Sequence, residues 1–102
     1  VSLNNVDHIA LNSNDPIASA DWYAEEFGGS IVYSDESWSM VEFENIKLSF
    51  VIPGSHPSHI AFEVESFGCN DIVKEHRDGS SSCYKKDEWG NIYELISYKK
   101  EG

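Results

Sequence analysis

A short pattern of residues occurs twice in this chain of 102 residues. Asp7-His8-Ile9-Ala10-Leu11 is matched by Ser58-His59-Ile60-Ala61-Phe62, so two of the four histidines occupy the same point of the same apolar pattern. A chain of this length forms one compact domain, so the repeat cannot represent two independent domains. We therefore expect a single domain, residues 1–102, with two similar halves at about 1–53 and 58–100 that share one core.

The first half predicts a strand, a helix and three further strands. Residues 6–11 place apolar side chains on both sides, as in a strand that is covered on both faces. Asp15 and Pro16 form an N-cap and first turn for a helix that ends near Phe27, where Gly28 follows. Short strands are predicted next, over 30–34, 39–43 and 46–52.

The second half repeats this order in fewer residues. It predicts a strand over 59–65, a helix over 70–77, a turn at Asp78-Gly79, and strands over 83–86 and 92–98. Only one good strand fits between this helix and the final strand, where the first half has two. We therefore expect the second half to be a shortened copy that lacks one strand.

The charge balance excludes several classes of partner. Seven Lys and Arg against eighteen Asp and Glu give a formal net charge of -11, which repels nucleic-acid phosphates and anionic lipid. No apolar run approaches the roughly 20 residues of a membrane span, and no secretory signal is visible. Cys69 and Cys83 lack the close spacing of a zinc or redox site. We expect a cytoplasmic protein with two free structural thiols, and no nucleic-acid or membrane partner.

Strand alternation predicts a metal site. His8 and His59 each share a strand face with an alanine, and Glu94 lies in the apolar strand near the end of the chain. If helices cover the larger apolar faces, the three side chains lie together on the concave side. Two imidazoles and one carboxylate suit Fe(II), Mn(II), Ni(II), Co(II) or Zn(II), and leave positions open for substrate. Each histidine could instead be merely packed or exposed, but a lone buried carboxylate would be costly without a cation.

Four further residues are candidates for the substrate pocket. Trp38, Met40 and Phe50 could form its wall, with the core or a dimer interface as the alternative. Glu42 alternates with apolar neighbours and could face the cleft as a general base, or lie in solvent. His56, in a loop with two prolines, is interpreted as a linker residue.

These residues together resemble the vicinal oxygen chelate superfamily, which includes glyoxalase I, extradiol dioxygenases, fosfomycin-resistance transferases, methylmalonyl-CoA epimerase and bleomycin-resistance proteins. The resemblance covers nearly the whole chain and depends on Asp7-His8-Ile9-Ala10-Leu11, Trp22-Tyr23, Phe27-Gly28, His59-Ile60-Ala61-Phe62-Glu63-Val64 and Gly90-Asn91-Ile92-Tyr93-Glu94-Leu95. It implies an α+β fold in which two βαβββ-type modules form a curved mixed sheet around a cleft, usually in a homodimer. It also implies that His8, His59 and Glu94 are the metal ligands.

One departure from the family pattern reduces the number of activities that we expect. Alignment of Asn45-Ile46 with Asn91-Ile92 puts Leu48 where four-ligand members such as glyoxalase I have Glu or Gln. Glyoxalase I activity is therefore not expected, and three-ligand members fit better. Extradiol dioxygenases are usually longer, however, and fosfomycin-type transferases need clustered Lys or Arg.

The sequence thus favours a metal-dependent lyase, isomerase or dioxygenase that chelates a small oxygenated substrate and stabilises an enediolate or oxyanion. Glu94 is the candidate catalytic residue as well as a ligand. The alternatives are a bleomycin-resistance-like protein that binds a small molecule without chemistry, and a regulatory subunit that keeps an ancestral site. A homodimer is expected, and whether its modules are swapped stays open.

Overall fold

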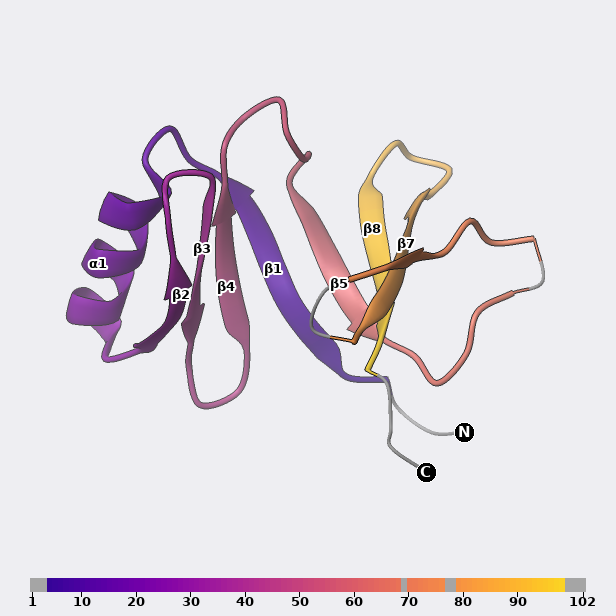
Figure 1. Cartoon of the computed structure of the whole chain (residues 1–102), viewed down its shortest axis with the longest axis horizontal. Coiled ribbons are helices and arrows are strands. Elements are labelled where there is room, and N and C mark those ends of the chain that lie inside the picture. Colours follow the sequence, from indigo (N-terminus) through magenta and orange to yellow (C-terminus); the bar gives the residue numbers. More distant parts are fainter. Residues whose placement is uncertain (1–3, 69, 77–78, 99–102) are drawn as a thin grey trace.

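In the computed structural model, residues 4–68, 70–76 and 79–98 are described, and they form one open, curved sheet and one helix (Figure 1). The elements are β1 (Val6–Asn12), α1 (Pro16–Phe27), β2 (Ser30–Ser34), β3 (Trp38–Glu42), β4 (Lys47–Val51), β5 (His59–Glu63), β6 (Lys74–Glu75), β7 (Ser81–Lys86) and β8 (Ile92–Ser97). The predicted strands agree with the observed ones to within two residues at each end. Cys69 and Asp78, for which a thiol and a turn were predicted, lie outside the described residues.

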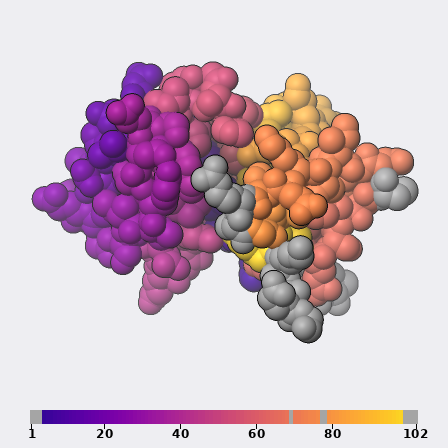
Figure 2. All heavy atoms as spheres, viewed as in Figure 1, coloured from indigo at the N-terminus to yellow at the C-terminus, as the bar shows by residue number. Residues whose placement is uncertain are grey.

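The strand order reveals the repeat. The sheet runs β2-β3-β4-β1-β5-β8-β7-β6, with β1 and β5 antiparallel at its centre. Each half places its last strand parallel to its first, as β4 beside β1 and β8 beside β5. Read outward from the centre, both halves therefore have the same order, and they form neighbouring lobes of the surface in Figure 2. The predicted α+β class with a curved mixed sheet is confirmed.

Helix α1 covers one face of the first half, against β2, β3 and β4. Asp15 caps it by accepting a hydrogen bond from the Ala18 backbone N–H at 3.1 Å, and Gly28 ends it with φ of 80°. Its apolar stripe buries Ala20 against Val41 and Phe50, which form the core of this half. Within the described part of the chain, no helix is both long and apolar enough to cross a membrane.

The helix predicted over 70–77 is wrong. Among the described residues of this segment, a turn at residue 70 is followed by residues 71–73, which have no regular secondary structure, and by the short strand β6. Ile72 is 91% exposed and Val73 is 40% exposed, so this segment buries no apolar stripe of the kind that holds α1 to the sheet. Asp71 instead accepts a hydrogen bond from the Gly68 N–H at 2.7 Å and pairs with Lys85 at 2.9 Å. In the described residues of the shortened half there is no helix, whereas the strand whose loss was predicted is present.

Candidate metal centre

His8, His59 and Glu94 converge from three adjacent strands, β1, β5 and β8. The register pairs His8 with Ala61, Ala10 with His59, and Ala61 with Glu94, so all three side chains share one face of the sheet. Their potential ligand atoms lie within 4.8 Å of one another. His8 Nε2 is 3.3 Å and His59 Nε2 is 3.2 Å from Glu94 Oε1. We call these three residues the triad; all are buried, with exposures of 8%, 6% and 4%.

The far nitrogen of each imidazole is held by an acceptor. His59 Nδ1 lies 2.8 Å from the carbonyl oxygen of Pro57, and His8 Nδ1 lies 2.7 Å from Asp7 Oδ2. Both oxygens only accept hydrogen bonds, so each Nδ1 holds a proton and donates it. In a neutral ring this leaves the Nε2 lone pair directed at Glu94. Three electron-pair donors that face one point repel one another unless a proton or a cation lies between them. Metal-binding histidines have the same arrangement, in which one ring nitrogen binds the metal and the other donates a hydrogen bond to an oxygen.

A β-bulge places Asp7 beside His8. Regular alternation would put adjacent residues on opposite faces, but the pairing of β1 with β5 shifts register between Val6 and His8. The Asp7 carboxylate also accepts from the Tyr98 hydroxyl at 2.8 Å and lies 3.4 Å from Lys47 Nζ. Sequence reasoning missed the roles of these partners. The one signal available was an acidic residue immediately before His8.

The electrostatics of the triad favour a positive charge at its centre. Burial opposes the protonated form of His8, but hydrogen bonds with Asp7 and Glu94 outweigh burial and raise the pKa of His8 to about 9. Burial likewise opposes the ionised form of Glu94, but its side-chain interactions with His59 and His8 lower the pKa of Glu94 to about 2. The free site therefore pairs a carboxylate with an imidazolium at neutral pH. A divalent cation bound to His8 Nε2 would displace that proton.

Tyr84 flanks the triad and was also missed. It lies on β7, opposite Glu94 in the register, and its ring is 5.0 Å from the His59 ring and perpendicular to it. The ring of His56, which was interpreted as a linker residue, stacks with the Tyr84 ring at a centroid distance of 5.9 Å. Burial and the Glu94 charge raise the pKa of Tyr84 to about 12, so its hydroxyl stays protonated. Tyr84 and His56 thus form an aromatic wall beside His59.

The predicted pocket residues separate into two groups. Trp38, Met40 and Glu42 alternate along β3, and the register through β4 to β1 puts them on the same face as the triad, two strands away from β1. Phe50 lies on the opposite face, where it is 2% exposed and packs in the core with Ala20. The structure therefore places Phe50 under α1 and not in a pocket wall, because alternation along β4 points it toward the helix.

The register also corrects the position of the missing fourth ligand. In the second half, Glu94 is the partner of Ala61; in the first half, the equivalent Ala10 is paired with Ser49. Ser49, and not Leu48, therefore corresponds to Glu94. Leu48 points to the opposite face and packs against the core under α1. Neither residue has a carboxylate, so the first half still contributes one triad residue and the second half two.

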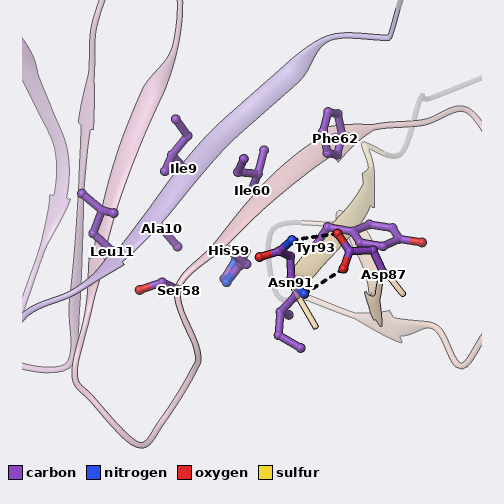
Figure 3. Close-up of a pocket in the computed structure, with 11 residues that line it drawn as sticks. Ile9, Ala10, Leu11, Ser58, His59, Ile60, Phe62, Asp87, Asn91 and Tyr93 are labelled. Atoms are coloured by element: carbon purple, nitrogen blue, oxygen red, sulfur yellow. Dashed lines mark hydrogen bonds between the residues drawn. The ribbon is translucent and has the colours of Figure 1, made fainter. Parts of the chain in front are cut away.

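A groove of about 460 Å³ lies mainly on the other face of the central strands (Figure 3). Its apolar side chains come from β1, β5 and β8, and Ile60 among them is 42% exposed. On its rim, the Asp87 carboxylate accepts hydrogen bonds from the backbone and side-chain N–H groups of Asn91 at 2.8 and 3.0 Å. His59 is the triad residue that also lines this groove. The groove is thus distinct from the point where the triad nitrogens meet Glu94.

Comparisons with known proteins show similarity in structure but not in sequence family. No protein-family model matches the chain. No curated protein matches it either. Among solved structures, a hypothetical protein from Bacillus halodurans has a TM-score of 0.76 at 16% identity, covering 99% of both chains.

Two epimerases are also similar. Streptomyces coelicolor methylmalonyl-CoA epimerase, in complex with 2-nitronate-propionyl-CoA, has a TM-score of 0.73 at 16% identity, covering 97% of this chain and 100% of that one. Methylmalonyl-CoA epimerase from Mycobacterium tuberculosis has a TM-score of 0.71 at 13% identity, covering 94% and 89%. The chain therefore has the fold of the methylmalonyl-CoA epimerases, which are members of the vicinal oxygen chelate superfamily.

Proposed function

We propose that this protein is a metal-dependent enzyme of the vicinal oxygen chelate type, which binds a divalent metal through His8, His59 and Glu94. The observation that supports the proposal is the convergence of three buried donor groups within 4.8 Å. The hydrogen bonds of the two Nδ1 atoms to Asp7 and to the Pro57 carbonyl add to it, because they leave each Nε2 available as a ligand.

The donor set fits the metal that we propose. Two imidazole nitrogens and one carboxylate suit Zn(II), Fe(II), Mn(II), Ni(II) or Co(II), and three protein ligands leave positions open for substrate oxygens. When bound, the metal would supply Lewis-acid stabilisation of the negative charge of an enediolate or oxyanion.

The chain's own groups would orient and enclose the substrate. Asp7 and the Pro57 carbonyl fix the tautomer and direction of the two imidazoles. The Tyr84 hydroxyl, which stays protonated, can donate a hydrogen bond to a substrate oxygen beside His59. The rings of Tyr84 and His56 would border the substrate on that side. Together these groups would hold a small oxygenated molecule beside the triad, and no large charged cleft would be needed.

The charge distribution favours a substrate without phosphate groups. Residues 1–53 contain nine Asp and Glu but a single basic residue, Lys47, and Lys47 already lies 3.4 Å from the Asp7 carboxylate. The fold neighbours are named as epimerases of methylmalonyl-CoA. We propose isomerase or lyase chemistry for this chain as well, on a smaller and less anionic substrate, since its negative field would repel a polyphosphate.

Metal analysis tests the proposal. We expect the wild-type protein, purified and loaded with Zn²⁺, to retain about one ion per chain, as a three-ligand site with an open position should. His59→Ala should lose the ion because it removes one of the three donors. His56→Ala is the matched control, since it removes a nearby imidazole that does not face Glu94, and it should retain the metal. A wild type without stoichiometric metal, or a His59→Ala variant that holds as much, would show the proposal to be wrong.

A further inference from the structure

Ser82 connects the triad to a second histidine that the proposed function does not use. Ser82 lies on β7, is 1% exposed, and shares the face of the sheet that carries Glu94, because Tyr84, two residues along, is the partner of Glu94. From this position its hydroxyl is a hydrogen-bond partner that helps to lower the pKa of Glu94. The same hydroxyl oxygen is 2.6 Å from Nε2 of His76. The three groups therefore form a continuous chain from the half-buried His76 to the buried ligand Glu94.

The direction of these hydrogen bonds is fixed by the groups involved. An ionised carboxylate only accepts, so the single proton of the Ser82 hydroxyl must be donated to Glu94. The hydroxyl oxygen must then accept from His76, which requires a proton on Nε2 of that ring. Each donor orients the next acceptor, and the carboxylate at the end has one preferred orientation.

His76 is held in place by the hairpin that replaces the predicted helix. Lys74 and Glu75 of β6 pair with Ser82 and Ser81 of β7. The His76 backbone N–H donates to the Ser80 carbonyl at 2.8 Å, and its own carbonyl accepts from the Gly79 N–H at 3.0 Å. The ring therefore reaches Ser82 from an anchored backbone, and this arrangement depends on extended chain at β6.

We propose that Ser82 and His76 are positioning residues for Glu94, which hold its carboxylate so that one oxygen faces both triad imidazoles. The inference rests on the proposed function in that it takes Glu94 to be a metal ligand. Hydrogen-bond partners of a ligand commonly contribute 10- to 100-fold to metal affinity, because an oriented ligand loses less freedom on binding. Ser82 acts directly on Glu94, and His76 acts through Ser82.

The test titrates the full chain with Co²⁺ alone and follows the visible absorption, which reports both affinity and ligand geometry. We expect Ser82→Ala to weaken Co²⁺ binding about 10- to 100-fold and to change the spectrum. His76→Leu should have a smaller effect of the same kind. His76→Gln, which keeps an N–H donor near the position of Nε2, should restore the wild-type spectrum.

Ser39→Ala is the matched control. Ser39 is equally buried and donates to the Pro16 carbonyl at 2.7 Å, but it lies under α1 and away from the triad. It should lose a comparable hydrogen bond without a change in the Co²⁺ spectrum. The proposal is overturned if Ser82→Ala binds Co²⁺ like the wild type, or if Ser39→Ala weakens binding as much.

A measurement on the metal-free protein separates this proposal from the proposed function. If the wild type binds no Co²⁺, the proposed function fails, and the positioning role is judged from ¹⁵N NMR signals of the imidazoles. Because His8 and His59 both face Glu94 Oε1, Ser82→Ala should shift their Nε2 signals, while Ser39→Ala should not. Unchanged signals in Ser82→Ala would overturn the positioning role.

Discussion

The two halves of the molecule share a strand order, but within the described residues a helix covers the first half alone. In the first half, α1 buries Ala20 against Val41 and Phe50. In the second half, residues 70–76 instead form a turn, an irregular segment and β6, and Ile72 is almost fully exposed. The pairing of β5 with β8 nonetheless matches that of β1 with β4. The register that aligns the triad is therefore set by the sheet and does not need a helix on both sides.

The halves also contribute unequally to the candidate metal centre. The first half supplies His8 with its partner Asp7, whereas the second half supplies His59, Glu94 and the Ser82 hydroxyl. The difference originates at one pair of equivalent positions, where the first half has Ser49. The half without a helix in its described residues thus supplies most of the polar groups of the candidate metal centre.

The largest effect on metal affinity is expected from substitutions at the two equivalent positions, Glu94 and Ser49. Glu94→Gln removes a charged donor from the triad and should weaken Zn²⁺ binding by more than about 100-fold, beyond the effect of losing a ligand's hydrogen-bond partner. Ser49→Ala, at the equivalent position, should leave Zn²⁺ affinity unchanged. Competition with a chromophoric chelator measures both affinities. Equal losses in the two variants would contradict the assigned asymmetry.

Stability should differ between the covered and the uncovered half. Phe50→Ala leaves a cavity under α1 and should lower the free energy of unfolding by about 3–5 kcal/mol. Ile72→Ala removes a side chain that is 91% exposed and should change it by less than about 0.5 kcal/mol. Urea denaturation followed by circular dichroism gives both values. A large loss in Ile72→Ala would mean that this residue is covered in solution.

The smallest expected effect is on the pH dependence of stability, and it comes from the turns that precede the last strand of each half. Hydrogen bonds from Asn91 hold the pKa of Asp87 below its usual 3.8, so the folded state binds this proton less readily than the unfolded chain. The resulting stabilisation is complete above the ordinary pKa of Asp and disappears as the pH falls below it. Asp87→Asn should therefore reduce the loss of stability between pH 6 and pH 3, as measured by urea midpoints. Glu44→Gln, in the corresponding turn of the first half, is the control; an unchanged pH dependence in Asp87→Asn would argue against the effect.

Local patterns predicted every strand except β6, and the convergence of His8, His59 and Glu94, because alternation and apolar spacing are encoded within a few residues. The prediction failed where a long-range contact decides the structure. Asp71 pairs with Lys85 of β7, a partner 14 residues away that no local pattern reveals. The contact of His76 with Ser82 depends on that outcome and could not be anticipated.

The error at Leu48 has a different origin. The matched Asn-Ile pairs placed the two last strands one residue out of phase, and a shift of one residue exchanges the two faces of a strand. Only the observed pairing of Ala10 with Ser49 identifies the equivalent position. The missing carboxylate was predicted, but the residue that replaces it was not.

The bulge at Asp7 has a consequence for how such a site can arise. In a regular strand, a ligand and its hydrogen-bond partner on the same face must be encoded two positions apart or on different strands. An extra residue in β1 lets adjacent codons encode both the imidazole and the carboxylate that orients it. A single-residue insertion could thus convert a bare histidine into an oriented one, and a single-residue deletion could undo it while the rest of the sheet stays paired.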